Sequence, residues 1–142
     1  MSNKARKVSG ATAGNLPEFD SSGDLVDSGY SPKKKKSVTY SGSRVNLTTS
    51  DLGKMIKLTS DDVIAYLPSV GSGQVDSWIM IVRLGDAKCE IRAADSDTIE
   101  KSSPGGAAIC DEPGRVAANL TLVLVTETQW AIESGTGIWA IF

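Results

Sequence analysis

Carboxylates are the side chains of this sequence with the clearest capacity for chemistry, because it contains no histidine. They form three clusters: Asp61-Asp62, Asp95 with Asp97, and Asp111-Glu112. Paired carboxylates hydrolyse glycosidic bonds. One class of polysaccharide-cleaving enzymes carries such a pair on a long β-helix, which a chain of this length cannot build. All three clusters fall in predicted turns, where Asp favours hydrogen bonds to nearby backbone. We therefore expect solvated turn residues, with an occasional metal contact as the alternative, and we expect no catalytic residue and no metal site.

Other catalytic arrangements are excluded by composition. Without histidine, neither a Ser-His-Asp nor a Cys-His arrangement can form, and no glycine-rich phosphate-binding motif is present. Cys89 and Cys110 are too few for a four-ligand zinc site. They could close a disulfide around a loop of about 20 residues, but the reducing cytoplasm favours two buried thiols. The sequence therefore predicts a non-enzymatic protein without a cofactor.

The three tryptophans, Trp78, Trp130 and Trp139, lie at or near the starts of predicted strands. A carbohydrate-binding module would present such rings as a platform for sugars. The alternative is that they fill a small core or a subunit interface. We expect the second role, most clearly for Trp78, because Trp130 and Trp139 flank an exposed turn.

Length and charge indicate two parts with different surroundings. The 142 residues suffice for one compact domain of roughly 100 residues and an arm. Residues 1–40 carry a charge of +3, whereas residues 41–142 carry −5. No apolar run reaches the ~18 residues of a membrane helix, and no signal-peptide core occurs near the start. We therefore expect assembly in a cytoplasm and no membrane partner.

The pattern along the chain predicts an arm at residues 1–32, a basic linker at 33–37 and a β-domain at 38–142. The arm is rich in glycine and poor in bulky apolar residues, and it holds one short hairpin around Ser21-Ser22-Gly23-Asp24. Four adjacent lysines at 33–36 repel one another, so we expect a solvated hinge. Contact with an acidic partner surface is the alternative. We expect no nucleic-acid binding, because no basic patch with interleaved aromatics follows.

Short apolar stretches separated by turn residues fill the rest of the sequence. Alternation of apolar residues is clearest at 78–84, where Trp78, Met80 and Val82 share one face. No helical period occurs, so we predict an all-β fold: a small β-sandwich or jelly roll preceded by an extended N-terminal arm. The predicted strands are 45–47, 55–58, 63–67, 78–84, 89–93, 98–100, 107–110 and 120–126, followed by a terminal hairpin of 129–133 with 138–142.

Two segments resemble known proteins. Residues 8–29 read V-S-G-A-T-A-G-N-x-x-x-F-D-S-x-G-x-L-V-D-S-G, and this pattern resembles the N-terminal segments of tailed-bacteriophage virion proteins, mainly head-fibre and capsid-decoration proteins and also some tail fibres. Residues 120–135 read L-x-L-V-L-V-x-x-x-x-W-x-I-x-S-G, which resembles the small β-domains that end phage fibre proteins.

The resemblance implies a capsid decoration or head-fibre protein, assembled in the host cytoplasm and displayed on the capsid surface of the virion. Its partner would be the major capsid protein of the same phage, contacted by apolar residues of the arm. The alternative is a tail-fibre or receptor-binding adhesin whose β-domain binds a host-surface glycan. The expected capsid-binding residues are Val8, Leu16, Phe19, Leu25, Val26 and Tyr30.

Two apolar strands suggest self-association. Residues 120–125 and 139–142 are apolar on both strand faces, and one face can fill the core while the other needs cover. Closed cyclic association supplies such cover. The number three is implied by the resemblance, because phage fibres and many decoration proteins are trimers. The expected homotrimer interface consists of Val123, Val125, Trp139 and Ile141.

Overall fold

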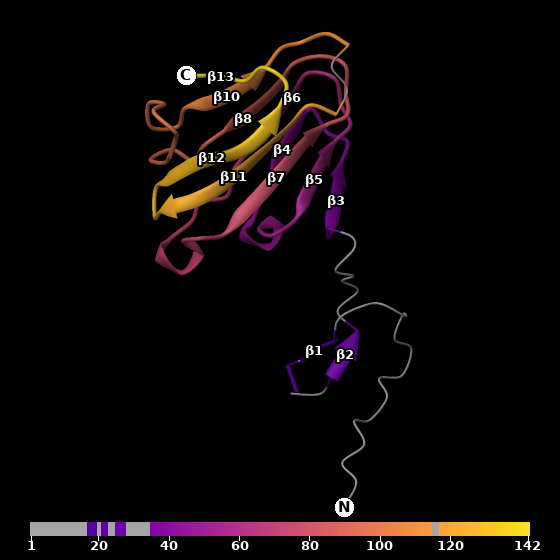
Figure 1. The fold of residues 1–142 in the computed structure, drawn as a ribbon, viewed down its shortest axis with the longest axis vertical. Coiled ribbons are helices and arrows are strands. Elements are labelled where there is room, and N and C mark those ends of the chain that lie inside the picture. Colours follow the sequence, from indigo (N-terminus) through magenta and orange to yellow (C-terminus); the bar gives the residue numbers. More distant parts are fainter. Residues whose placement is uncertain (1–16, 20, 23–24, 28–34, 115–116) are drawn as a thin grey trace, which may run out of the picture. The chain divides into compact units, whose positions relative to one another are not determined.

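The computed structural model describes residues 17–19, 21–22, 25–27, 35–114 and 117–142. The chain divides into two compact units, Met1–Lys36 and Ser37–Phe142. In the first unit, β1 (Pro17–Phe19) and β2 (Leu25–Asp27) pair in an antiparallel two-stranded ribbon (Figure 1). Two strands alone are marginally stable in water, so this ribbon gains from a partner surface.

The second unit, called the body below, contains eleven strands in its described residues, consistent with an all-β fold of two packed sheets (Figure 1). The predicted fold class is confirmed. No helix in the described ranges is long and apolar enough to cross a membrane. The strands are β3 (Ser37–Tyr40), β4 (Arg44–Asn46), β5 (Met55–Leu58), β6 (Val63–Tyr66), β7 (Trp78–Arg83), β8 (Cys89–Arg92), β9 (Thr98–Ile99), β10 (Ala107–Cys110), β11 (Asn119–Thr126), β12 (Gln129–Thr136) and β13 (Ala140–Ile141).

Successive strands from β3 to β10 alternate between the two sheets. One sheet has the order β3-β5-β7-β11-β12-β9 and the other β13-β10-β8-β6-β4. The strands β3, β5 and β7 are parallel neighbours, as are β4, β6 and β8. The first half of the body is therefore a coil of three turns, each contributing one strand to each sheet. This order differs from the antiparallel Greek keys of a jelly roll, so the sandwich alternative holds.

The core lies between the two sheets and follows from the alternation of side chains along each strand. In β7, Ile79 and Ile81 are fully buried, while Trp78, Met80 and Val82 take the outer face. Trp130 is the largest buried side chain of the core and is fully buried. Members from the six-stranded sheet include Ile56, Leu58, Leu120, Leu122 and Leu124, and those from the five-stranded sheet include Val45, Val63, Ala65, Cys89, Ile91 and Ala108.

The turns between the sheets stack on one another and form what we call the stacked corner, residues 41–43, 59–62 and 84–88. Thr59 N–H donates to Tyr40 O at 3.1 Å, and Leu84 N–H donates to Leu58 O at 2.7 Å. Gly85 is buried there, and a Cβ at this position would lie 2.2 Å from Ser60 O. The close approach of the two turns therefore requires glycine at position 85.

The predicted terminal hairpin is wrong. Strand β12 continues through Ser134-Gly135 to Thr136 and pairs with β11, with a register shift between Thr121 and Leu122. Strand β13 crosses to the other sheet and pairs with β10. The Ser-Gly-Thr-Gly sequence is typical of a turn, but only Gly137 within it takes a left-handed φ, +89°. The chain therefore changes sheets after β12 and does not fold back on it.

Candidate functional site

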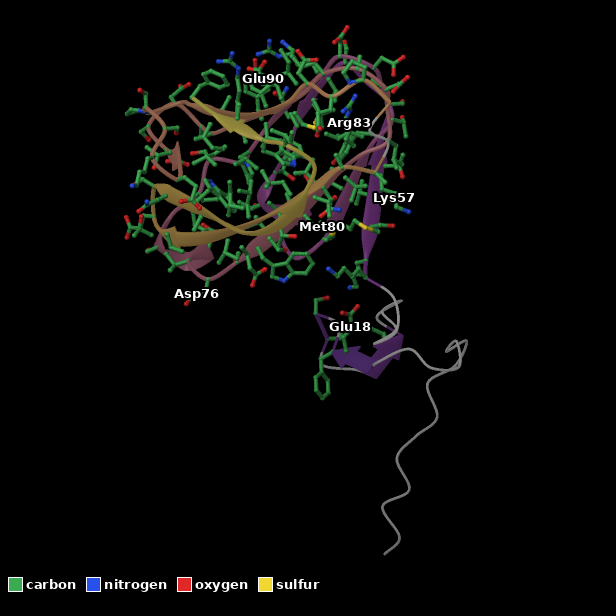
Figure 2. The ribbon with its side chains drawn as sticks, turned by 45° about the horizontal axis from the view of Figure 1, so that its top comes forward. Glu18, Lys57, Asp76, Met80, Arg83 and Glu90 are labelled. Atoms are coloured by element: carbon green, nitrogen blue, oxygen red, sulfur yellow. The ribbon has the colours of Figure 1, made fainter. Side chains whose placement is uncertain are left out.

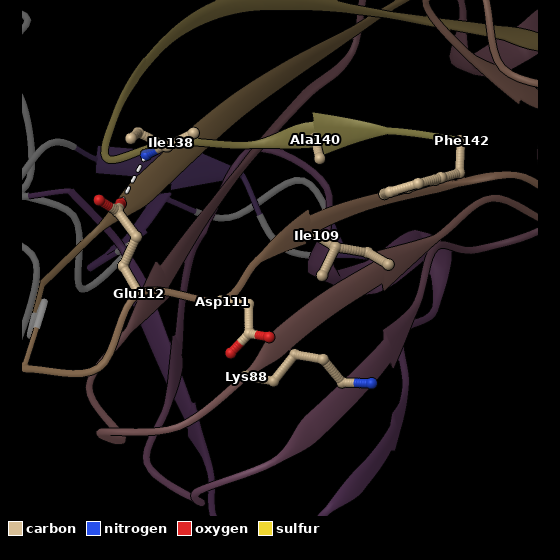
Figure 3. A pocket seen from close by; sticks show the side chains of 7 residues that line it. All are labelled: Lys88, Ile109, Asp111, Glu112, Ile138, Ala140 and Phe142. Carbon is tan, nitrogen blue, oxygen red and sulfur yellow. Dashed lines mark hydrogen bonds between the residues drawn. The ribbon is translucent and has the colours of Figure 1, made fainter.

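A groove lies at the edge of the five-stranded sheet, among the described residues of the body. Its volume is about 470 Å³, within the range of ligand pockets. Its floor and walls are apolar, and its rim carries charges of both signs (Figure 3). The lining residues are Lys88, Ile109, Asp111, Glu112, Ile138, Ala140 and Phe142.

The groove arises from the pairing of β13 with β10. Ile109 is in register with Ala140, and Phe142 and Ala107 exchange backbone hydrogen bonds of 3.0 and 3.2 Å. Because side chains alternate along a strand, Ala140 and Phe142 face outward, whereas Trp139 and Ile141 pack against the core. The outward side chains are exposed, at 65% for Phe142.

Glu112 holds the start of the C-terminal segment in place. Its Oε2 accepts a hydrogen bond from Ile138 N–H at 2.6 Å (Figure 3) and a weaker one from Cys110 Sγ at 3.9 Å. Its carbonyl oxygen accepts from Arg83 Nη1 at 2.8 Å. Ile138 itself stays 71% exposed beside this anchor. Glu112 is therefore a positioning residue of the groove wall.

Arg83 is buried between the sheets, with 1% of its surface exposed (Figure 2). Its Nη1 also donates to Cys110 Sγ at 3.6 Å, while Nε and Nη2 have no hydrogen-bond partner among the described residues. The alternation of β7 places Arg83 on the same face as Ile79 and Ile81, and that face is buried. Its hydrogen bond to the loop that carries Glu112 was not predicted.

Charges continue from the groove across the outer face of β8. Glu90 is in register with Ile109 and lies on the side of the body opposite Met80 (Figure 2). Its side chain is only 3% exposed. Its carboxylate forms ion pairs with Arg92 Nε and with Lys88 Nζ, the latter at 3.5 Å. Glu90 therefore lies between two cations on this face, next to the acidic residues of the groove rim.

The two cysteines are free and buried, which agrees with the expectation of two buried thiols over a disulfide. Cys89 and Cys110 lie directly opposite each other on β8 and β10. Burial raises the pKa of the Cys89 thiol to about 12, with a smaller contribution from the nearby Cys110. Cys89 therefore stays protonated at neutral pH, and both buried cysteines pack as apolar side chains.

The acidic clusters bond mainly to backbone in the described residues. Asp61 accepts from Asp86 N–H at 2.7 Å, and Asp62 accepts from Lys88 N–H at 3.3 Å, so both bridge neighbouring turns of the stacked corner. Asp95 is exposed, whereas Asp97 is 4% exposed with one carboxylate oxygen without a hydrogen-bond partner. Burial raises the pKa of the Asp97 carboxyl. No group of three or more His, Cys, Asp or Glu side chains in the described ranges is placed to hold a metal ion.

The predicted trimer residues lie on two different sheets. Val123 is half-buried on the outer face of β11, in register with Trp78 and Ala131, and Val125 is 43% exposed near the end of that strand. Trp139 and Ile141 lie half-buried on the inner side of the C-terminal segment. Contact of either pair with another copy stays a prediction. Ile138 and Phe142 were not predicted as surface residues of this segment, because the sequence does not show which of its alternating side chains face outward.

The predicted arm residues are described only in part. Phe19 is 71% exposed on β1, Val26 is half-buried on β2, and the backbone of Leu25 pairs with that of Phe19. Val8, Leu16 and Tyr30 lie outside the described residues. Phe19 is therefore the clearest exposed apolar side chain among the described residues of the first unit.

The three tryptophans differ in position, and the one buried in the core is Trp130, although a core or interface position was expected most clearly for Trp78. Trp130 lies in the core, and its Nε1 has no hydrogen-bond partner among the described residues. Trp139 Nε1 donates to Thr136 O at 3.0 Å. Trp78 is half-buried on the outer face of the six-stranded sheet.

No protein-family model matches the sequence, and no curated protein matches it.

Proposed function

We propose that this chain is a non-enzymatic structural protein of a tailed-bacteriophage virion, a capsid decoration or head-fibre protein anchored to the shell by its N-terminal arm. The observation that carries the proposal is the β1–β2 ribbon, which belongs to a unit separate from the body and exposes 71% of Phe19. A two-stranded ribbon with an exposed aromatic ring gains most from a partner surface.

The attachment works by strand addition. Both ribbon strands offer backbone groups that can pair with a sheet of the major capsid protein, while Phe19 enters an apolar groove of the shell. Ordering the arm on binding offsets part of the contact energy. A homotrimer compensates for this cost, because three arms on one particle raise the effective concentration without any new contact. The protein assembles in the host cytoplasm and is displayed on the capsid surface.

Particle binding tests this proposal. Particles that lack the protein are mixed with purified wild-type chain, with a chain lacking residues 1–32, and with Phe19→Ser, and bound protein is measured by co-sedimentation. Leu84→Ser is the matched control, because it removes an exposed apolar side chain of the body that lies outside the expected trimer interface. We expect wild type and Leu84→Ser to bind, and the other two to fail. Binding of the truncated chain at the wild-type level would refute arm attachment.

A second candidate function, an adhesin that binds a host-surface glycan, is favoured by the groove. The exposed ring of Phe142 offers a stacking surface for a sugar, and Asp111 offers acceptors for hydroxyl groups. A glycan array probed with wild-type chain and Phe142→Ala tests it. Selective binding that is lost in Phe142→Ala would favour the adhesin. If the chain bound no host polysaccharide, the proposed decoration protein would be favoured.

A further inference from the structure

The edge of the five-stranded sheet at β13 combines two features of an interaction surface, exposed apolar side chains and an edge strand. Ile138 and Phe142 are 71% and 65% exposed, more than any other large apolar side chain described in the body. Both line the same groove, together with Ile109 and Ala140 (Figure 3). Large apolar side chains gathered in one exposed row mark an interaction surface.

Among the described strands, β13 pairs with β10 on one side and has no neighbour on the other. In an antiparallel pair, alternate residues direct their N–H and C=O groups to the partner strand. Phe142 bonds to Ala107 of β10, so the groups of the preceding residue, Ile141, point away from β10 to the open edge. The strand is only two residues long, and this limits uncontrolled edge pairing.

The rim of the groove identifies the kind of occupant. It carries Lys88 on one strand connection and Asp111 on another, so charges of both signs border the same apolar floor. A surface that carries both signs can be complementary in charge to another copy of itself. A partner that carries charges of one sign only would bind better to a rim that carries only the opposite sign.

We infer that the groove is occupied by a second copy of this chain, and that the interface of the proposed homotrimer runs through Ile138 and Phe142. The same apolar row of each copy packs against its neighbour, and Lys88 of one copy faces Asp111 of the next. This inference rests on the proposed trimer and moves its interface to a single sheet. It drops the expected Val123 and Val125, which lie on the six-stranded sheet, and replaces Trp139 and Ile141, which pack inward, by the outward residues of the same segment.

Light scattering and sedimentation velocity of the full chain over a range of micromolar concentrations test the inference. Phe142→Ser and Ile138→Ser should each raise the concentration of half-dissociation about tenfold or more. Val125→Ser, on the other sheet, should leave it unchanged. Circular dichroism of each variant checks that the body is folded. Asp111→Lys should weaken association by placing like charges together, and adding Lys88→Glu should restore it.

The outcomes separate the inference from the proposal beneath it. A trimer lost with Phe142→Ser but kept with Val125→Ser supports the inference. A trimer kept with Phe142→Ser and Ile138→Ser overturns the inference and leaves the proposed trimer standing. A wild-type mass of 14.9 kDa at every concentration overturns both. A groove that binds a glycan in the trimeric protein also overturns the inference, because a second copy would cover it.

Discussion

Gly85→Ala tests the stacked corner, the contact that joins successive turns of the coil. The new Cβ would lie 2.2 Å from Ser60 O, 2.6 Å from Ser60 C and 2.9 Å from Asp61 N, all backbone atoms. Ordinary contacts begin near 3.4 Å, so one turn must move by about 1 Å. No side chain can rotate away to relieve this clash.

The expected loss of stability follows from that displacement. Forcing extra volume into a packed site costs about 1–3 kcal/mol. Moving the corner also weakens the bond from Asp86 N–H to Asp61 Oδ1, and a typical hydrogen bond contributes about 1 kcal/mol. We therefore expect a loss of about 2–3 kcal/mol. For a body of this size, that lowers Tm by roughly 8–20 °C.

Thermal unfolding followed by circular dichroism measures the effect, with Gly73→Ala as the matched control. A Cβ at Gly73 meets nothing within 4 Å, and its φ is not left-handed. This control should unfold at the wild-type temperature or slightly above it, because alanine reduces the freedom of the unfolded chain. Equal Tm values for Gly85→Ala and wild type would refute the close stacking of the two turns.

Three further predictions concern the arm, a buried carboxyl and catalysis. Deleting residues 1–32 should leave the thermal unfolding of the body nearly unchanged, since they belong to a separate unit; a much lower Tm would mean that the arm stabilises the body. The raised pKa of Asp97 means that the folded state keeps its proton above the ordinary value of 3.8, so the free energy of unfolding should fall as pH rises through the raised pKa. Asp97→Asn should abolish this fall and be more stable at neutral pH, as urea unfolding between pH 4 and 7 would measure; the same pH dependence in the variant would contradict the assignment. Host polysaccharide should not be cleaved, and reproducible cleavage lost on replacing Asp95 and Asp97 would overturn the non-enzymatic proposal.

Strand positions were predictable because their signals are local. The predicted strands 55–58 and 107–110 have the bounds of β5 and β10, since alternation and turn residues define both ends. The pairing of strands was not predictable in the same way, because it depends on contacts between distant residues. The coil from β3 to β8 has no exact sequence repeat, with 18 residues from Ser37 to its partner Met55 and 25 from Met55 to Met80.

The groove could not be predicted because it depends on the parity of one short strand. A shift of one residue moves every side chain of a strand to the other face. Trp139 and Ile141 are as apolar as Ile138 and Phe142, so composition could not decide which pair faces outward. The hydrogen bond of the buried Arg83 was not predictable for another reason: its partner is a carbonyl 29 residues away in sequence.

The location of the protein on native particles tests the central proposal most directly. Antibodies raised against the body, residues 37–142, would be applied to intact phage and detected by immunogold electron microscopy. The proposal predicts gold distributed over the head surface, and its loss from particles assembled with a chain lacking residues 1–32. Gold confined to the tail would favour the adhesin, and particles without any gold would contradict a place in the virion.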